Sequence, residues 1–475
     1  MMAEASGALY AAREKIHPKA VRGRFRRWKD AIGWTLAAVF FIVPWLRWDR
    51  PGDLPDQAVL LDIANKRGFL FDMNIWPQDI VYMAVALVLG TVALFMTASV
   101  AGRVWCGFSC PQTVFTDIFV RIEKMWEGDR AARMKMDAAP WSTRKLLRRG
   151  GKHMTWIAVA AAFGATFSFY FTDAPAALMD YLTLDAGLWM WTTVLILGGT
   201  TYLLAGFARE QFCNYMCPWP RLQSCMLDEH SLVVTYRDDR GDARAAKRKS
   251  QTWEERRAAG FGDCVSCQQC VQVCPMGIDI REGVNADCIN CGLCIDACDT
   301  MMDKVGLDRG LIAFDSLANA RARRVGRAEP SRIVRPRTIA FAAVIGVICV
   351  GVLGTFLMRS DLEVALIQER SPLYVRLSDG SIRNAYDLKI LNKREQDRRF
   401  ALEVAGNPSA RIETLDASGE GEGVELAVEG GRHVSRKVFV TVPGPDADVS
   451  DMTLVMRDTA TGAEVRRDVV FALPR

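Results

Sequence analysis

The sequence predicts a helical membrane protein with about five spans, a cysteine-rich module on its cytoplasmic side and a small all-β domain at its C-terminus. Three observations predict this architecture: long apolar stretches between charged loops, two cysteine runs of identical spacing, and alternating apolar residues beyond Met358. The chain has 475 residues, a length that is enough for several domains, and half of its residues are hydrophobic.

Five stretches are long and nearly free of charge, and each reaches or approaches the ~20 residues that cross a bilayer. Core helices of globular proteins seldom run that far without a charged residue. The first stretch is the least regular, because Pro44 interrupts it near its end. The five predicted spans cover residues 31–46, 80–100, 154–171, 186–207 and 339–358.

Basic residues crowd the segment before the first span, which places the N-terminus in the cytoplasm by the positive-inside rule. No small-residue cleavage site follows, so we expect this span to remain as an anchor. Alternation then puts 48–78, 172–185 and the residues after Met358 outside, with 172–185 as a short turn. None of the 14 cysteines lies in these three segments, as expected if the thiols stay on the reducing side.

The predicted domain organisation follows from these spans. It comprises a basic arm (1–30), four spans (31–207) with a cytoplasmic loop at 101–153, a cytoplasmic region (208–337) with a ferredoxin-type module at about 255–305, a fifth span (338–358) and a periplasmic domain (359–475). Membrane lipid is one expected partner, and the basic run between Ser231 and Ala259 is either solvated or touches anionic headgroups. Nothing in the sequence suggests nucleic acid.

Two cysteine runs with the spacing C-x2-C-x2-C-x3-C occupy residues 264–298. Thiolates at this spacing hold a [4Fe-4S] cluster, and in two-cluster ferredoxins the fourth cysteine of each run binds the other cluster. The first run closes with the usual Pro275, whereas Asp299 follows the second. We therefore predict a first cluster on Cys264, Cys267, Cys270 and Cys298, and a second on Cys288, Cys291, Cys294 and Cys274.

Two other uses of these cysteines fit less well. A zinc site would need only two C-x2-C pairs, so the third and fourth cysteine of each run would be surplus. Disulfides would require an oxidising compartment, whereas the predicted topology places this module in the cytoplasm.

A second cysteine pattern, C-x3-C-P, occurs once after the second predicted span and once after the fourth. An Ala-Gly and then an arginine, Arg103 or Arg209, precede each pair, which suggests an internal repeat. On a helix, positions i and i+4 share a face, so each pair is expected to present two sulfurs together. The four candidate thiols are Cys106, Cys110, Cys213 and Cys217.

These four thiols could bind Cu(I), hold a further iron-sulfur centre, cycle as dithiols or fill apolar space. For Cys225 and Cys349 we expect packing. The four histidines lie outside the spans, which disfavours a haem with two histidine ligands there.

Beyond Met358, apolar residues alternate in short runs that Gly, Pro, Asn and Asp interrupt, which is typical of an antiparallel sandwich. A domain of this size accommodates about seven strands. It contains no cysteine, so packing alone must hold its core. A binding or docking role is expected, since no catalytic constellation is visible there.

With both cysteine patterns the chain resembles the CcoG family, also called FixG or RdxA, in stretches such as WCGFSCPQTVFTDIF, REQFCNYMCPWPRLQS and CINCGLCIDACD. The resemblance implies a bacterial inner-membrane protein with cytoplasmic clusters and an immunoglobulin-like periplasmic domain. It further implies a role in biogenesis of cbb-type cytochrome c oxidase, with reduction of Cu(II) to Cu(I). Expected partners are copper chaperones or transporters, oxidase assembly factors and an unidentified electron donor. A homodimer with a second copy of the chain is a further alternative.

Two other functional classes stay open. Membrane ferredoxins that pass quinol electrons to a periplasmic reductase share the C-x3-C-P pairs and a cluster module, but they lack the C-terminal sandwich. An assembly scaffold with structural clusters is the third reading, and cluster reduction by a physiological partner would separate it from the other two.

Overall fold

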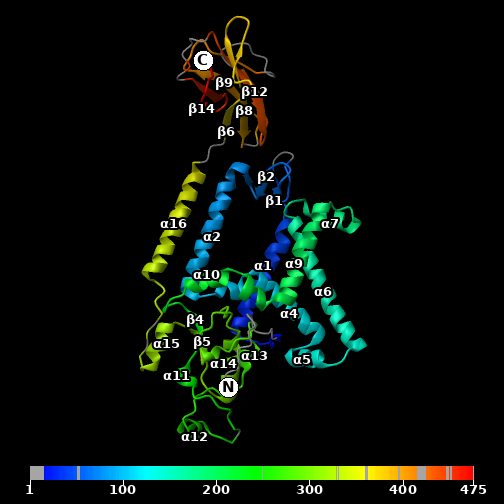
Figure 1. The fold of residues 1–475 in the computed structure, drawn as a ribbon, viewed down its shortest axis with the longest axis vertical. Helices are drawn as coiled ribbons and strands as arrows, with labels where there is room; N and C mark the ends of the chain where they lie inside the picture. The colour runs from blue at the N-terminus through cyan, green and yellow to red at the C-terminus, as the bar shows by residue number, and fades with distance from the viewer. Residues whose placement is uncertain are drawn as a thin grey trace, which may run out of the picture. The chain divides into compact units, whose positions relative to one another are not determined.

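The structure is a computed structural model that describes residues 15–50, 54–248, 250–327, 329, 331–358, 362–393, 396–414, 424–444, 449 and 452–473. The chain divides into two compact units (Figure 1). One unit contains Met1–Trp48 and Asp56–Gly351, and the other contains Asp49–Pro55 and Val352–Arg475. Each unit is described by itself below.

Three helices are long and apolar enough to cross a membrane: Pro77–Ala101, Leu188–Ala208 and Pro336–Leu357. They contain α2 (Ile80–Ala101), the run from α8 (Leu188–Thr193) through α9 (Gly199–Leu203), and α16 (Pro336–Leu357). The other two predicted spans lie in α1 (Arg24–Ile42) and α6 (Thr143–Ser168), whose first turns are basic. Three of the five predicted spans thus lie in helices that are long and apolar enough to cross a membrane, and α1 and α6 contain most of the other two predicted stretches.

The segments between these helices are more ordered than the sequence suggested. Residues 172–185, predicted as a turn, contain α7 (Ala174–Thr183), so that prediction was wrong. The side chain of Asp173 caps this helix by accepting a hydrogen bond from the Ala176 amide. Pro44 does end the first predicted span, in a 3-10 turn (Val43–Trp45). A small antiparallel sheet follows, made of β1 (Val59–Asp62), β2 (Arg67–Leu70) and β3 (Met73–Ile75).

The loop predicted at 101–153 is largely helical and packs against the membrane helices. It contains α3 (Val104–Phe108), α4 (Pro111–Glu127) and α5 (Arg130–Ala138), and α6 begins within it. Phe119 of α4 stacks on Trp156 of α6 with ring centroids 5.0 Å apart, and Ala205 completes the same apolar cluster. This packing fixes the position of α4 beside the second C-x3-C-P pair.

The cysteine-rich module is built on a two-stranded antiparallel sheet, β4 (Val233–Tyr236) and β5 (Ile312–Asp315). All four residues of β4 are buried, because the cysteine loops cover this strand. Figure 1 shows β4, β5, α13 and α14 gathered together. The helices of this region are α10 (Trp219–Cys225), α11 (Asp238–Gly241), α12 (Trp253–Ala258), α13 (Gln269–Gln272), α14 (Leu293–Val305) and α15 (Leu317–Arg324).

The second unit contains a sandwich of two antiparallel sheets, with strand orders β10-β12-β8-β6 and β11-β9-β13-β14, and β7 pairs with β8. Tyr386, Leu388 and Ile390 of β8 face Phe400 and Leu402 of β9 in its core. Nine strands are described, two more than the sequence suggested. They are β6 (Leu362–Gln368), β7 (Val375–Arg376), β8 (Ile382–Asn392), β9 (Arg398–Ala405), β10 (Arg411–Thr414), β11 (Val424–Val428), β12 (His433–Val442), β13 (Thr453–Asp458) and β14 (Glu464–Asp468).

Candidate iron-sulfur and thiol site

The eight cysteines of the two runs line two neighbouring cavities. Each cavity also has apolar walls, and Cys270 borders both. The structure places the fourth cysteine of each run beside the other run. The first cavity is lined by Cys264, Cys267, Cys270 and Cys298, and the second by Cys274, Cys288, Cys291 and Cys294.

Left-handed residues between the cysteines turn the backbone around these cavities. Gln268 (φ 54°) precedes α13 and Gly292 (φ 70°) precedes α14. Neither residue caps its helix with a side chain. The first backbone N–H groups of α14 can therefore donate hydrogen bonds to an acceptor next to Cys294. The sulfides of a cluster are such acceptors.

Apart from the exposed Cys267, the cysteines of the two runs are buried or half-buried. Burial raises the pKa of the Cys274 thiol to about 12 and that of the Cys288 thiol to about 11. Thiols with such high pKa values are poor nucleophiles, whereas iron binding holds them as thiolates. This donor set, two groups of four thiols in apolar cavities, fits two [4Fe-4S] clusters.

The two C-x3-C-P pairs have the same local structure, as the repeat predicted. In each, a helix ends at a residue with positive φ, Gly102 or Arg209 (φ 62° and 42°). The first cysteine, Cys106 or Cys213, lies in a short helical turn, and the second has extended backbone before its proline. The expectation that each pair shares one helix face was wrong, because a residue that precedes proline avoids the helical region.

The four thiols lie close enough to interact electrostatically. Burial, and then the thiolate charges of Cys110, Cys106 and Cys217, raise the pKa of Cys213 to about 12. Within the described residues, however, no three His, Cys, Asp or Glu side chains surround a single metal position. Cys225 and Cys349, for which packing was expected, are both exposed on the chain, and Cys349 lies in the apolar helix α16.

The first pair packs directly against the second cysteine run. Gly107 lies so close to this run that an added Cβ would be 2.5 Å from the Ile289 carbonyl oxygen and 3.0 Å from the Cys291 Cα. Cys106, Cys291 and Ile289 belong to one buried cluster, which Cys213 also contacts. The thiol pairs and the second cavity therefore form one continuous site.

Arg103 is a buried cation at this junction, with 3% of its surface exposed. It donates a hydrogen bond from Nη1 to the Ala286 carbonyl, while Nε and Nη2 lack a partner of good geometry among the described residues. The guanidinium lies near the thiols of Cys106 and Cys288 and acts to lower the pKa of each, against the larger effect of burial. A buried guanidinium with two unmatched nitrogens favours an anionic neighbour, and a thiolate-bound cluster is one.

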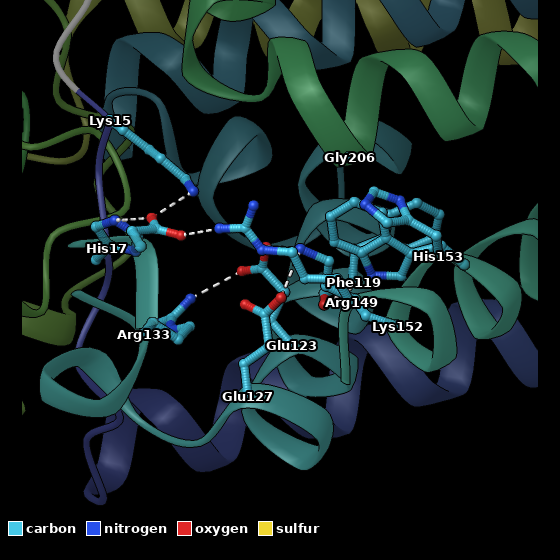
Figure 2. Close-up of polar contacts among 12 residues, drawn as sticks. Lys15, His17, Phe119, Glu123, Glu127, Arg133, Arg149, Lys152, His153 and Gly206 are labelled. Atoms are coloured by element: carbon cyan, nitrogen blue, oxygen red, sulfur yellow. Dashed lines mark hydrogen bonds and ion pairs between the residues drawn. The ribbon is translucent and has the colours of Figure 1, made fainter. Parts of the chain in front are cut away.

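Glu123 of α4 fixes the second arginine of the repeat. Its carboxylate accepts a hydrogen bond from Arg209 at 2.6 Å and one from Arg133 at 2.8 Å. Lys152 pairs with Glu127, one turn further along α4, at 2.9 Å (Figure 2). Glu123 is only 5% exposed, so its two arginine partners offset the cost of burying its charge. It thereby holds the backbone just before Cys213.

Sequence reasoning paired Arg103 with Arg209 but missed Gly107, Glu123 and Asn290. Asn290 donates a hydrogen bond to the Ala101 carbonyl at 3.3 Å and so ties the second cysteine run to the end of α2. The only available signal was a pair of acidic residues four positions apart on α4, Glu123 and Glu127. That pattern is equally common on solvated helices.

Comparison with known protein families gives three matches along the chain. Residues 83–127 match a 4Fe-4S binding domain, 208–317 match a 4Fe-4S dicluster domain, and 352–474 match the IG-like fold at the C-terminus of FixG. The first match contains the first C-x3-C-P pair, and the second contains both cysteine runs.

Three relatives cover nearly the whole chain. The nitrogen fixation protein FixG of Rhizobium meliloti is 43% identical over 99% of this chain and 95% of its own length. Protein RdxB of Cereibacter sphaeroides is 40% identical over 98% of both chains. Protein RdxA of the same organism is 42% identical over 97% of this chain and 96% of its own.

Proposed function

Because the chain belongs to the family of FixG, RdxA and RdxB, and is an iron-sulfur electron-transfer protein, we propose that it reduces Cu(II) to Cu(I) for the biogenesis of a cbb-type cytochrome c oxidase. Copper is the substrate, and the product passes to a copper chaperone, transporter or assembly factor. The observation that carries this proposal is the contact between Gly107 and Cys291, which joins a soft thiol site to an iron-sulfur site.

We assign Cys264, Cys267, Cys270 and Cys298 to one [4Fe-4S] cluster, and Cys288, Cys291, Cys294 and Cys274 to the other. The grouping of these thiols around two cavities supports the assignment. When bound, the clusters supply one-electron storage, and one stored electron reduces one Cu(II) to Cu(I).

Cys106, Cys110, Cys213 and Cys217 are the proposed copper-binding thiols. Thiolates prefer Cu(I) over harder ions, so a site of two to four sulfurs favours the reduced product. Cys106 is buried and the other three thiols are half-buried, which limits access of water, and the contact of Cys106 with the Cys291 region keeps the path to the second cluster short. We place this site on the cytoplasmic side of the membrane and the C-terminal domain in the periplasm.

The proposal is tested by anaerobic reaction of dithionite-reduced, desalted protein with Cu(II), followed by the change in cluster absorbance. We expect the clusters to be oxidised, and we expect Cys110→Ser with Cys217→Ser to abolish this reaction while iron content stays at about eight atoms. The matched control replaces the exposed Cys225 and Cys349 by serine and should react like the parent.

Three results would contradict parts of this scheme. A double variant that reacts as fast as the parent would remove the C-x3-C-P thiols from the copper path. About twelve iron atoms, falling to about eight in the double variant, would assign these thiols to a third cluster. Clusters that no added oxidant can reoxidise would favour a structural scaffold.

A further inference from the structure

A cavity of about 700 Å³ opens beside the second cysteine run, between residues 16–23, α1 and α4. We propose that this cavity binds reduced flavin mononucleotide, which donates electrons to the clusters. The volume lies within the range of small-molecule sites. The inference rests on the proposed electron-transfer function and names the class of its electron donor.

The inner wall of the cavity belongs to the iron-sulfur site. It contains Cys213 and four apolar residues that flank cluster cysteines: Val273, Met276, Ile289 and Leu293. These residues share one buried cluster with Cys291, and they also contact Cys274 and Cys294. A flat ring against this wall would therefore be separated from the second cluster by single side chains.

The charges inside the cavity are largely compensated. Asp117 pairs with Arg26 at 2.7 Å and with Lys29 at 3.7 Å. Arg209 and Arg133 are held by Glu123. Asp129 accepts a hydrogen bond from the Ala20 amide, and Asp30 pairs with Arg26 at 2.8 Å. The remaining acidic residue of the lining is Glu210, which is 6% exposed.

Four further cations of the lining make no ion pair with any described residue. They are Lys19, Arg22, Arg27 and Lys124, and the last three are exposed. An apolar inner wall with unpaired cations around it suits a ligand that has an aromatic body and an anionic tail. A phosphate-bearing flavin has this form, whereas a neutral quinol offers nothing to the four cations.

Redox chemistry favours a flavin over a nicotinamide as the electron donor. A cluster accepts one electron at a time, while a reduced nicotinamide gives two electrons together as a hydride. Reduced flavin releases its electrons singly through a semiquinone. FMNH2 thus becomes FMN with loss of two electrons and two protons, the two clusters take up one electron each, and the protons leave to solvent through the open side of the cavity.

Equilibrium binding tests the site without relying on turnover. FMN is titrated into the full-length detergent-solubilised protein, and quenching of flavin fluorescence gives the dissociation constant. We expect saturable binding that Arg27→Glu with Lys124→Glu weakens by about tenfold or more, because two attractive charges become repulsive. The exposed Lys135 of α5 lies outside the lining, so Lys135→Glu should bind FMN like the parent.

Riboflavin, which lacks the phosphate, separates ring binding from charge recognition. We expect it to bind the parent more weakly than FMN and to respond little to the charge reversal. The proposal would be overturned if the variant lost affinity for FMN and riboflavin equally, or if the parent showed no saturable FMN binding. Unchanged iron content in the variant shows that the result does not come from misfolding.

The electron step is tested by adding photoreduced FMN to the oxidised protein under anaerobic conditions. We expect cluster bleaching equivalent to one electron per cluster, and none with NADH alone. Clusters that a quinol analogue reduces and FMNH2 does not would assign the donor role to quinol and overturn the proposal. Dithionite-reduced parent protein treated with Cu(II) needs no flavin, so failure of the copper step is distinguishable from failure of the donor site.

Discussion

At the scale of single residues, Arg103 sets the electrostatics of the junction between the thiol pairs and the second cluster. Its guanidinium is buried, and only one of its nitrogens has a matched acceptor among the described residues. A fixed positive charge in such surroundings stabilises the more negative, reduced form of a neighbouring cluster.

We predict that Arg103→Gln lowers the reduction potential of one cluster by tens of millivolts and leaves the other unchanged. An anaerobic redox titration followed by electron paramagnetic resonance measures both potentials. Arg103→Lys keeps the charge, so the reduction potential of this cluster should stay close to that of the parent. Equal shifts of both clusters, or none, would show that Arg103 serves packing alone.

Asp117 of α4, a half-buried carboxylate, shows how ion pairs contribute to stability near the cavity. Burial by itself would raise the pKa of this carboxyl, but Lys29 and Arg26 lower it to about 2. Because the folded state holds the ionised form more tightly than the unfolded chain, Asp117 stabilises the fold above its ordinary pKa of 3.8. That contribution is lost as the pH falls through about 2.

We therefore predict that Asp117→Asn destabilises the protein by about 2 kcal/mol at neutral pH. The difference from the parent should shrink steadily between pH 4 and pH 2. Thermal unfolding of iron-depleted protein measures it, since acid loss of clusters then plays no part. A difference that is constant with pH would mean that hydrogen-bond geometry, and not charge, accounts for the effect.

At the scale of elements, α3 contacts the loop that carries Cys288 and Cys291. Gly107 makes this contact possible, because a Cβ there would lie 2.5 Å from a backbone oxygen that cannot rotate away. Any larger residue must push α3 and this loop apart, although neither element needs to unfold.

Gly107→Ala should consequently slow copper-dependent oxidation of the clusters by about tenfold or more, while the iron content is retained. Stopped-flow absorbance gives the rate. Gly150→Ala is the matched control, because an added Cβ at that helical position meets nothing within 4 Å. Unaltered kinetics in the Gly107 variant would argue against electron passage across this contact.

At the scale of the whole molecule, the distribution of charge predicts sidedness. Basic residues stand at the N-terminal ends of α1 and α6, just before the apolar part of each helix. By the positive-inside rule these ends are expected in the cytoplasm, and we expect the cysteine-rich module on the same side. A thiol-rich module in the cytoplasm stays reduced, and a C-terminal domain without cysteine tolerates an oxidising compartment.

We predict that alkaline phosphatase fused after Arg475 is active in cells and that the same reporter fused near Gly260 is inactive. A cytoplasmic reporter such as β-galactosidase at the two positions should give the reverse pattern. An active phosphatase at Gly260 would place the cysteine module in the periplasm. The number of spans before it would then differ from the predicted number by an odd count.

The sequence by itself determined the parts whose signals are local. Cysteine spacing indicated two clusters, because ligands two or three positions apart lie on one loop whatever surrounds it. Apolar length indicated the membrane helices, and period-two alternation indicated the C-terminal sandwich. The α7 helix could also have been predicted, since Asp173 followed by Pro175 marks a helix start.

Only the tertiary structure decided which of these parts meet. Gly107 lies on Cys291, Glu123 holds Arg209, and the lining of the cavity beside α4 comes from four separate segments of the chain. No periodicity or spacing links residues so far apart, because such contacts depend on how helices pack. The chemistry of the thiols follows from their order along the chain, but their place beside a cluster and a charged cavity follows from packing.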